Sequence, residues 1–313
     1  MSLKSKLLLA LATLLLVAGG IMFVLALMLN GWKFVEKETN EYEISEEFHS
    51  ISIDIDTTDI KILPASDGVC RAVVTDDEKV SHSFTVEGGV LKITTSYDMK
   101  WYQQILPKAS SFVTLYLPLA EYGKLSADMS TGDVEICSGL KFGEIDISVS
   151  TGDVKCSSDA YIIKIHGSTS NVTLENASTA SVDISVTTGD IEATDLSVSG
   201  TAKLGVSTGK IRLTRVSCLS LESTGSTGDV ILTDVIASAK FVIKRSTGVV
   251  EFNSSDAAEI EVETDTGDVK GTLRSEKVFI VRTDTGKINV PDSVSGGKCK
   301  ITTDTGDVEI SIK

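Results

Sequence analysis

The sequence predicts an all-β protein: a right-handed β-solenoid, or β-helix, of about ten coils of 19–20 residues, preceded by one transmembrane α-helix. Three observations lead to this prediction. A Thr-Gly dipeptide recurs at near-constant spacing, apolar and polar residues alternate on both sides of each dipeptide, and one uncharged apolar run stands close to the N-terminus. Repeats of about 20 residues are typical of solenoids, in which each coil buries its apolar face against its neighbours.

The Thr-Gly dipeptide defines the repeat unit. Successive glycines, counting Ser170 of Thr169-Ser170 in the one gap, are 20, 18, 19, 20, 19, 20, 19, 19 and 20 residues apart. Ten units therefore cover residues 125–313. The dipeptides are Thr131-Gly132, Thr151-Gly152, Thr188-Gly189, Thr208-Gly209, Thr227-Gly228, Thr247-Gly248, Thr266-Gly267, Thr285-Gly286 and Thr305-Gly306.

Apolar residues occupy fixed positions in every unit. The fifth residue before the glycine is apolar except at Ser223, and the residue two after it is always Val or Ile. This second column is Val134, Val154, Val172, Ile191, Ile211, Val230, Val250, Val269, Ile288 and Val308. Alternation with period two predicts a strand on each side of the turn, with one face buried.

Glycine suits the turn because it adopts positive φ without steric cost, and the Thr before it is expected to form a structural ladder. Coils stacked about 4.8 Å apart give a rod roughly 45–50 Å long. A propeller blade usually needs 40 or more residues, and a sandwich would not repeat side chains at fixed offsets.

Residues 42–124 lack the Thr-Gly repeat but still predict strands, and we expect them to cap the solenoid. Glu87-Gly88-Gly89 is a hairpin signal, and Thr57 to Ile62 resembles a degenerate coil. No cap is visible at the C-terminus, where the chain stops in the strand-like segment Ile310–Lys313. An open last coil would be an edge for self-association through the C-terminal coil.

The N-terminus predicts a membrane anchor. Leu7 to Leu29 is 23 residues without a charge, which is long enough to cross a bilayer as a helix. Lys4 and Lys6 place residues 1–6 in the cytoplasm as a short tail. Residues 30–41 then form a linker, and the C-terminal domain lies outside the cell membrane. The alternative is a cleaved signal peptide and a secreted protein.

With these motifs the chain resembles the bacterial "putative adhesin" family, a domain of unknown function that includes LiaG-like proteins. The residues that carry the resemblance are Ile51-Ser52-Ile53-Asp54, Glu87 to Ile93, Val113 to Pro118 and the repeated Thr-Gly-Asp-Val turns. It covers about residues 42–313. The resemblance implies a β-solenoid in the cell envelope, often behind one transmembrane helix; it implies no ligand and no catalytic residue.

The composition and the absence of known motifs limit the partners and reactions that this protein can have. A net charge of −15 argues against nucleic acid as a partner. Triad and phosphate-loop motifs are absent, and His49, His82 and His166 are expected on the surface rather than as a general base. The sequence thus predicts no enzyme, no catalytic residue and no cofactor. Trp101 to Pro107 is the one aromatic-rich loop; it is expected either to bind a partner or to pack on the cap or touch the membrane.

An acidic residue follows the turn glycine in most units. These residues are Asp133, Asp153, Asp190, Asp229, Asp268 and Asp307. A column of carboxylates could bind a cation such as Ca²⁺. Lys210, Val249 and Lys287 interrupt the column, so the preferred interpretation is that each Asp accepts a hydrogen bond from turn N–H groups.

We therefore expect a membrane-anchored, extracytoplasmic binding, adhesion or scaffold module whose partner is an unknown envelope protein or glycan. One alternative is an envelope-stress accessory or regulatory partner of a membrane sensor, acting through the helix and the cap. Another is a polysaccharide-active enzyme, which the few aromatic residues disfavour. Five Cys are too few for a disulfide scaffold, and Cys156 and Cys299 fall at buried positions.

Overall fold

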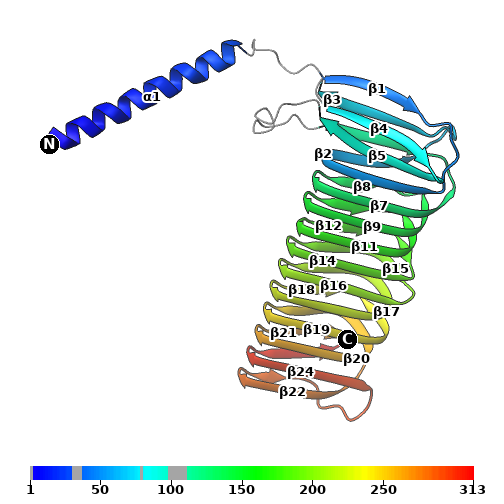
Figure 1. Ribbon diagram of the computed structural model, residues 1–313. Helices are drawn as coiled ribbons and strands as arrows, with labels where there is room; N and C mark the ends of the chain where they lie inside the picture. Colours follow the sequence, from blue (N-terminus) through cyan, green and yellow to red (C-terminus); the bar gives the residue numbers. More distant parts are fainter. Residues whose placement is uncertain (1–2, 30–36, 78–79, 98–110) are drawn as a thin grey trace.

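The computed structural model describes residues 3–29, 37–77, 80–97 and 111–313. It shows an all-β, right-handed solenoid of about nine turns, close to the ten coils that the repeat predicts. The coils stack into a rod with a strand-rich cap at the N-terminal end (Figure 1). The repeat therefore predicted the architecture correctly.

The N-terminal helix α1 (Leu3–Leu29) has 27 residues. Its side chains are described at positions 5, 6, 12–22 and 25. No helix formed by the described residues combines the length and the apolarity that crossing a membrane requires.

The strands that lead into the Thr-Gly turns form the first face of the solenoid. They pair in parallel at matching repeat positions, so that Ile145, Ile163 and Val182 lie above one another. The strands are β7 (Glu121–Thr131), β9 (Lys141–Thr151), β11 (Asp159–Thr169), β14 (Ser181–Thr188), β16 (Thr201–Thr208), β17 (Ile211–Thr227), β19 (Ile236–Thr247), β20 (Val250–Thr266), β22 (Lys277–Thr285) and β24 (Gly297–Thr305).

The strands after the turns form the second face. β17 and β20 are long enough to begin on this face and to end on the first face of the next coil. The remaining strands are β8 (Val134–Ile136), β10 (Val154–Cys156), β12 (Val172–Glu175), β15 (Ile191–Val198), β18 (Val230–Thr233), β21 (Val269–Leu273), β23 (Ile288–Asn289) and β25 (Val308–Ile312). A short third ladder joins β13 (Ser178–Thr179) to the end of β15, the middle of β17, the start of β19 and the middle of β20.

The core is a narrow column filled by the inward side chains of these faces. The predicted apolar positions are almost fully buried except in the rung formed by β22 and β23, and the aromatic pair Phe241 and Phe252 stacks inside with ring centroids 6.2 Å apart. Because the faces approach closely, Val, Ile and Leu fill most of the space, which explains the low aromatic content.

The cap contains the first coil of the solenoid. β2 (Ser50–Pro64) pairs with the first repeat unit at Thr57 with Thr131 and at Ile60 with Val134, so the degenerate coil is a true rung. Its other edge is covered by β5 (Val90–Tyr97) and β6 (Ser111–Leu117). β3 (Arg71–Asp77) and the β4–β5 hairpin, with β4 at Val80–Glu87, complete the cap.

One cap boundary differs from the prediction. β1 (Lys37–Glu43) starts inside the stretch assigned to a linker over residues 30–41 and pairs antiparallel with β3. The alternation that marks strands elsewhere is missing in Lys37–Glu43, because only Tyr42 is apolar. Strand formation there is decided by the partner β3.

The last two coils exchange places along the rod. β24 pairs with β20 on one edge and with β22 on the other, and β25 likewise lies between β21 and β23. The chain therefore passes from β21 to the outermost rung and then returns (Figure 1). The expectation that the C-terminal strand is an open edge was wrong, since β25 is paired on both sides and β22 and β23 form the end.

Candidate functional site

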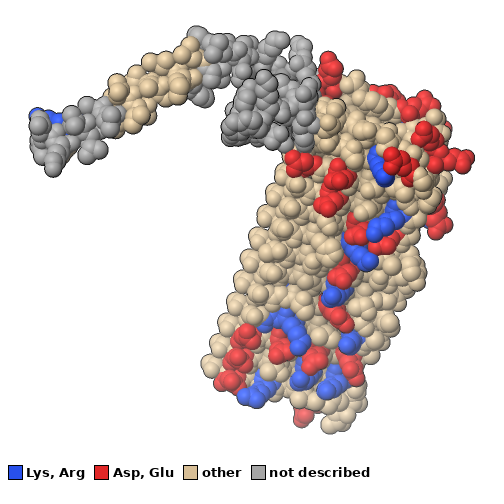
Figure 2. All heavy atoms as spheres, in the orientation of Figure 1, with Lys and Arg blue, Asp and Glu red and all other residues tan. Residues whose placement is uncertain are grey.

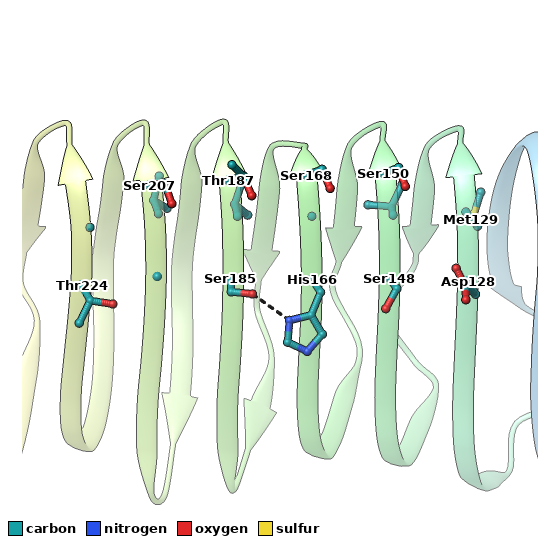
Figure 3. A pocket seen from close by; sticks show the side chains of 16 residues that line it. Asp128, Met129, Ser148, Ser150, His166, Ser168, Ser185, Thr187, Ser207 and Thr224 are labelled. Atoms are coloured by element: carbon teal, nitrogen blue, oxygen red, sulfur yellow. Dashed lines mark hydrogen bonds between the residues drawn. The ribbon is translucent and has the colours of Figure 1, made fainter.

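A shallow groove crosses the first face of the solenoid. Its volume is about 390 Å³, and its lining comes from β7, β9, β11, β14, β16 and β17. The lining residues lie two to four positions before the turn glycine of each coil. Figure 3 shows their side chains repeating from rung to rung, with Ser148, His166 and Ser185 in adjacent rungs.

The groove is built from two outward columns of small polar residues. We call this surface the hydroxyl face; it consists of the second residues before the turn glycines from Ser130 to Ser246 and the fourth residues from Ser148 to Thr224. These positions hold no Lys, Arg, Asp or Glu, whereas the fourth-position column continues to Asp128, which also lines the groove, at one end and to Lys244 at the other. The two columns are Ser148, His166, Ser185, Gly205 and Thr224, and Ser130, Ser150, Ser168, Thr187, Ser207, Ser226 and Ser246.

Two features shape the groove. His166 Nδ1 lies 2.8 Å from Ser185 Oγ, which fixes the exposed imidazole against the neighbouring rung. Gly205 carries no side chain, and a Cβ built there would have its nearest atom 3.6 Å away, so the position is open. The stacked strands hold both columns rigidly at a spacing of about 4.8 Å.

A stripe of alternating charges borders the hydroxyl face on the side away from the turns (Figure 2). Lys124 Nζ lies 2.8 Å from Asp146 Oδ2, and Lys164 Nζ lies 3.0 Å from Glu144 Oε1. The hydrogen bond from Lys164 lowers the pKa of Glu144, and the hydrogen bond to Asp146 raises the pKa of Lys124. Exposed pairs of this kind add little stability, but they separate the neutral face from the rest of the surface.

The turn carboxylates form a hydrogen-bonded ladder. Asp133 Oδ1 accepts a hydrogen bond from the N–H of Asp153 at 2.7 Å, and Asp190 Oδ1 accepts one from the N–H of Lys210 at 2.8 Å. The same bond recurs at Asp153, Asp229, Asp268 and Asp307. Within the part of the chain that the structure describes, no three His, Cys, Asp or Glu side chains group so that they could hold a metal.

The Thr-Gly turns are packed backbone against backbone. Gly152 has φ +140°, and a Cβ on it would collide with the carbonyl of Gly132. In the one unit without this glycine, the buried Ser170 takes its place, and Gly167 leaves room for the Ser170 side chain. The geometry of the turns therefore indicates a structural role. Their side chains lie beside the hydroxyl face rather than in it.

A buried polar cluster in the cap escaped sequence analysis. His82 Nδ1 lies 2.8 Å from Asp76 Oδ2, and His82 Nε2 lies 3.1 Å from Thr58 Oγ1. The His82 side chain is fully buried, so the expectation of a surface histidine was wrong there. Asp76 and His82 are six residues apart in the chain, on the consecutive strands β3 and β4, and this short separation is the sequence signal for their proximity.

All five cysteines are free thiols. Cys70, Cys156, Cys218 and Cys299 are buried, and burial raises the pKa of Cys156 to about 11. A thiol with so high a pKa is a weak nucleophile. The aromatic loop from Trp101 to Pro107 lies outside the described residues.

Solved structures share the fold. A "putative lipid binding protein" from Parabacteroides distasonis aligns with a TM-score of 0.53 and 18% identity over 88% of this chain and 97% of that one. "Putative adhesin" structures from P. distasonis and Bacteroides fragilis align with TM-scores of 0.47 and 0.42 and identities of 15% and 14%. They cover 89% and 88% of this chain and 98% and 97% of theirs.

No curated protein matches the sequence. A family profile does: the one described as "Toastrack DUF4097" matches residues 48–217, which is more than half of the chain and includes most of the cap, the first rungs and most of the hydroxyl face. The match agrees with the resemblance inferred from the Thr-Gly-Asp-Val turns. The chain therefore belongs to the Toastrack DUF4097 family.

Proposed function

We propose that this protein is a membrane-anchored, extracytoplasmic binding module that holds a neutral glycan of the cell envelope on its hydroxyl face and catalyses no reaction. The observation that carries the proposal is the groove of about 390 Å³, lined by hydroxyl groups in regular rows together with the His166 imidazole and, at one end, the Asp128 carboxylate. Neighbouring folds described as adhesins and a lipid-binding protein support a binding role in general.

The chemistry of the groove favours a neutral, hydroxyl-rich ligand. Ser and Thr hydroxyls both donate and accept hydrogen bonds, so they can match sugar hydroxyls in either sense. A net charge of −15 opposes an anionic polymer. The groove is open and runs across several rungs, which suits an extended chain better than a compact small molecule.

The anchor rests on the sequence. The uncharged run from Leu7 to Leu29 falls within α1, and Lys4 and Lys6 precede it. On the evidence of the sequence, we propose that the segment from Leu7 to Leu29 crosses the cell membrane with its N-terminus in the cytoplasm. Deleting residues 1–29 should release the protein from the membrane fraction. Protease added to intact cells should degrade the solenoid; full protection would contradict the orientation.

A substitution that fills the groove tests the ligand face. Gly205→Arg should lower binding of the full chain to an array of neutral oligosaccharides at least tenfold, because Gly205 has open space for a side chain. Ser197→Arg is the matched control, since Ser197 is exposed on the third ladder and the substitution adds the same charge. Equal binding by both variants would contradict the proposal. Binding to the anionic polysaccharide hyaluronate, with no binding to the neutral oligosaccharides, would also contradict it.

The same experiment separates the alternatives. If adhesion is intrinsic, the protein without residues 1–29 still binds the array. If the protein instead regulates a membrane sensor through α1 and the cap, even the full chain does not bind the glycan array. Deleting residues 1–29 then abolishes regulation of the sensor. Turnover of the oligosaccharides by purified protein would favour an enzyme.

A further inference from the structure

The outermost rung of the solenoid has an unpaired edge. β22 pairs with β24, and β23 pairs with β25; no other described strand pairs with either. The other first-face strands, from β7 to β20 and β24, are each paired on both sides. Because unpaired N–H and C=O groups readily accept another strand, this edge is the natural place for association.

The core is also open at this rung. Phe279 and Val281 are only partly buried, whereas the residues that pair with them, Cys299 and Ile301, are 1% and 0% exposed. Ile280 and Ile288 expose 51% and 49% of their surfaces. The end of the rod therefore presents an apolar surface beside the free backbone edge.

The backbone shows which residues of β22 face the free edge. The Thr285 carbonyl accepts a hydrogen bond from the N–H of Gly306, so it points toward β24. Backbone groups of successive residues in a strand point to opposite edges. The N–H and C=O groups of Arg282 and Asp284 consequently point away from β24, where a further strand would pair.

The outward charges on β22 are complementary to themselves. Arg282 and Asp284 lie two residues apart on the same strand, with side chains 77% and 58% exposed. In an antiparallel pair of two β22 strands centred on Thr283, Arg282 of each copy lies opposite Asp284 of the other. In this register Arg282 of one copy and Asp284 of the other form a hydrogen-bonded pair of residues, as the direction of their backbone groups requires.

We propose that a second copy of this chain occupies the edge, so that two molecules join end to end through antiparallel β22 strands centred on Thr283. The apolar side chains Ile280 and Phe279 are covered in the same contact. If the N-terminal helix anchors the protein as proposed above, the dimer links two anchored molecules through the ends farthest from their anchors. The contact itself does not depend on glycan binding or on the anchor.

Charge exchange tests the contact sharply. The full chain in detergent should be dimeric by light scattering, and Arg282→Asp and Asp284→Arg should each be monomeric because like charges then face one another. An equimolar mixture of the two variants should regain dimers, since every facing pair is again opposite in charge. Circular dichroism must show that each variant is folded.

Cross-linking tests the register. Thr283→Cys should give a disulfide-linked dimer under mild oxidation, because each Thr283 lies opposite its counterpart and non-hydrogen-bonded pairs approach closely. Thr302→Cys on β24 is the control and should not cross-link. A wild-type chain that stays monomeric, or single charge variants that dimerise normally, would overturn the proposal; a dimer without cross-linking at 283 would overturn the register. Neither result bears on the glycan array.

Discussion

Arg245 lies inside the solenoid and donates a hydrogen bond from Nη2 to Ser223 Oγ over 3.1 Å. Its Nη1 donates to the carbonyl of Val206 at 3.2 Å, and the absence of a side chain at Gly225 leaves room for the guanidinium. Arg245 is 3% exposed, and burial lowers its pKa to about 10. The serine in an otherwise apolar column is therefore explained by an arginine in the next coil.

Removing both members of this pair should be tolerated better than removing one. Ser223→Ala leaves the guanidinium short of a partner and should cost about 1–2 kcal/mol. Ser223→Ala with Arg245→Met also removes the buried charge and should restore stability to at least that of the wild type. Urea unfolding of the wild type, Ser223→Ala, Arg245→Met and the double variant measures this; equal losses for the single and double variants would contradict it.

Acid should weaken the turn ladder at Asp229. The hydrogen bond from Lys210, with a smaller one from the N–H of Val249, lowers the pKa of Asp229 in the folded state. The unfolded chain then binds the proton more readily, so this stability is present above the ordinary carboxyl pKa and is lost as the pH falls through the folded value.

Asp229→Asn tests this dependence. The stability difference between wild type and variant should shrink as the pH is lowered from about 6 to about 3. Lys210→Met, which removes the main cause of the shift, should reduce the same pH-dependent part. A difference that stays constant over this range would show that the carboxylate contributes no charge-dependent stability.

Breaking the buried cluster should loosen the cap before the coils. Asp76→Ala removes the acceptor 2.8 Å from His82 Nδ1 and leaves that ring nitrogen buried without a partner. We expect a loss on the order of 3 kcal/mol. Hydrogen exchange should quicken in β3 and β4 while β11 to β16 keep their protection, because a solenoid coil contacts only its neighbours. Uniformly faster exchange would contradict a local role.

Replacing Gly152 or Gly205 with alanine should change the stability of the protein by very different amounts. Gly152→Ala places a methyl group against the carbonyl of Gly132 at φ +140° and should cost at least about 2 kcal/mol. Gly205→Ala adds a methyl group whose nearest neighbour lies at an ordinary van der Waals distance of 3.6 Å, and it should change stability by less than about 1 kcal/mol. Thermal unfolding of both variants under one buffer condition gives the comparison.

Periodicity made the fold predictable. Each coil repeats the same inward positions, so the column from Val134 to Val308 specified the strands, their buried faces and their stacking. The cap was less readable, because β1 has no alternation and depends on β3. The hydroxyl face could be seen in the sequence as outward Ser and Thr, but its identity as a groove depended on Gly205 and on the His166–Ser185 contact.

The sequence by itself determined that the chain is a solenoid of Thr-Gly coils behind an apolar helix-forming segment. The tertiary structure alone decided the order of the last coils, and with it which strand is the free edge. The reason is physical: all coils carry the same apolar columns, so β24 fits on β20 as well as β22 would. A repeat specifies what each coil buries but not which copy it is buried against.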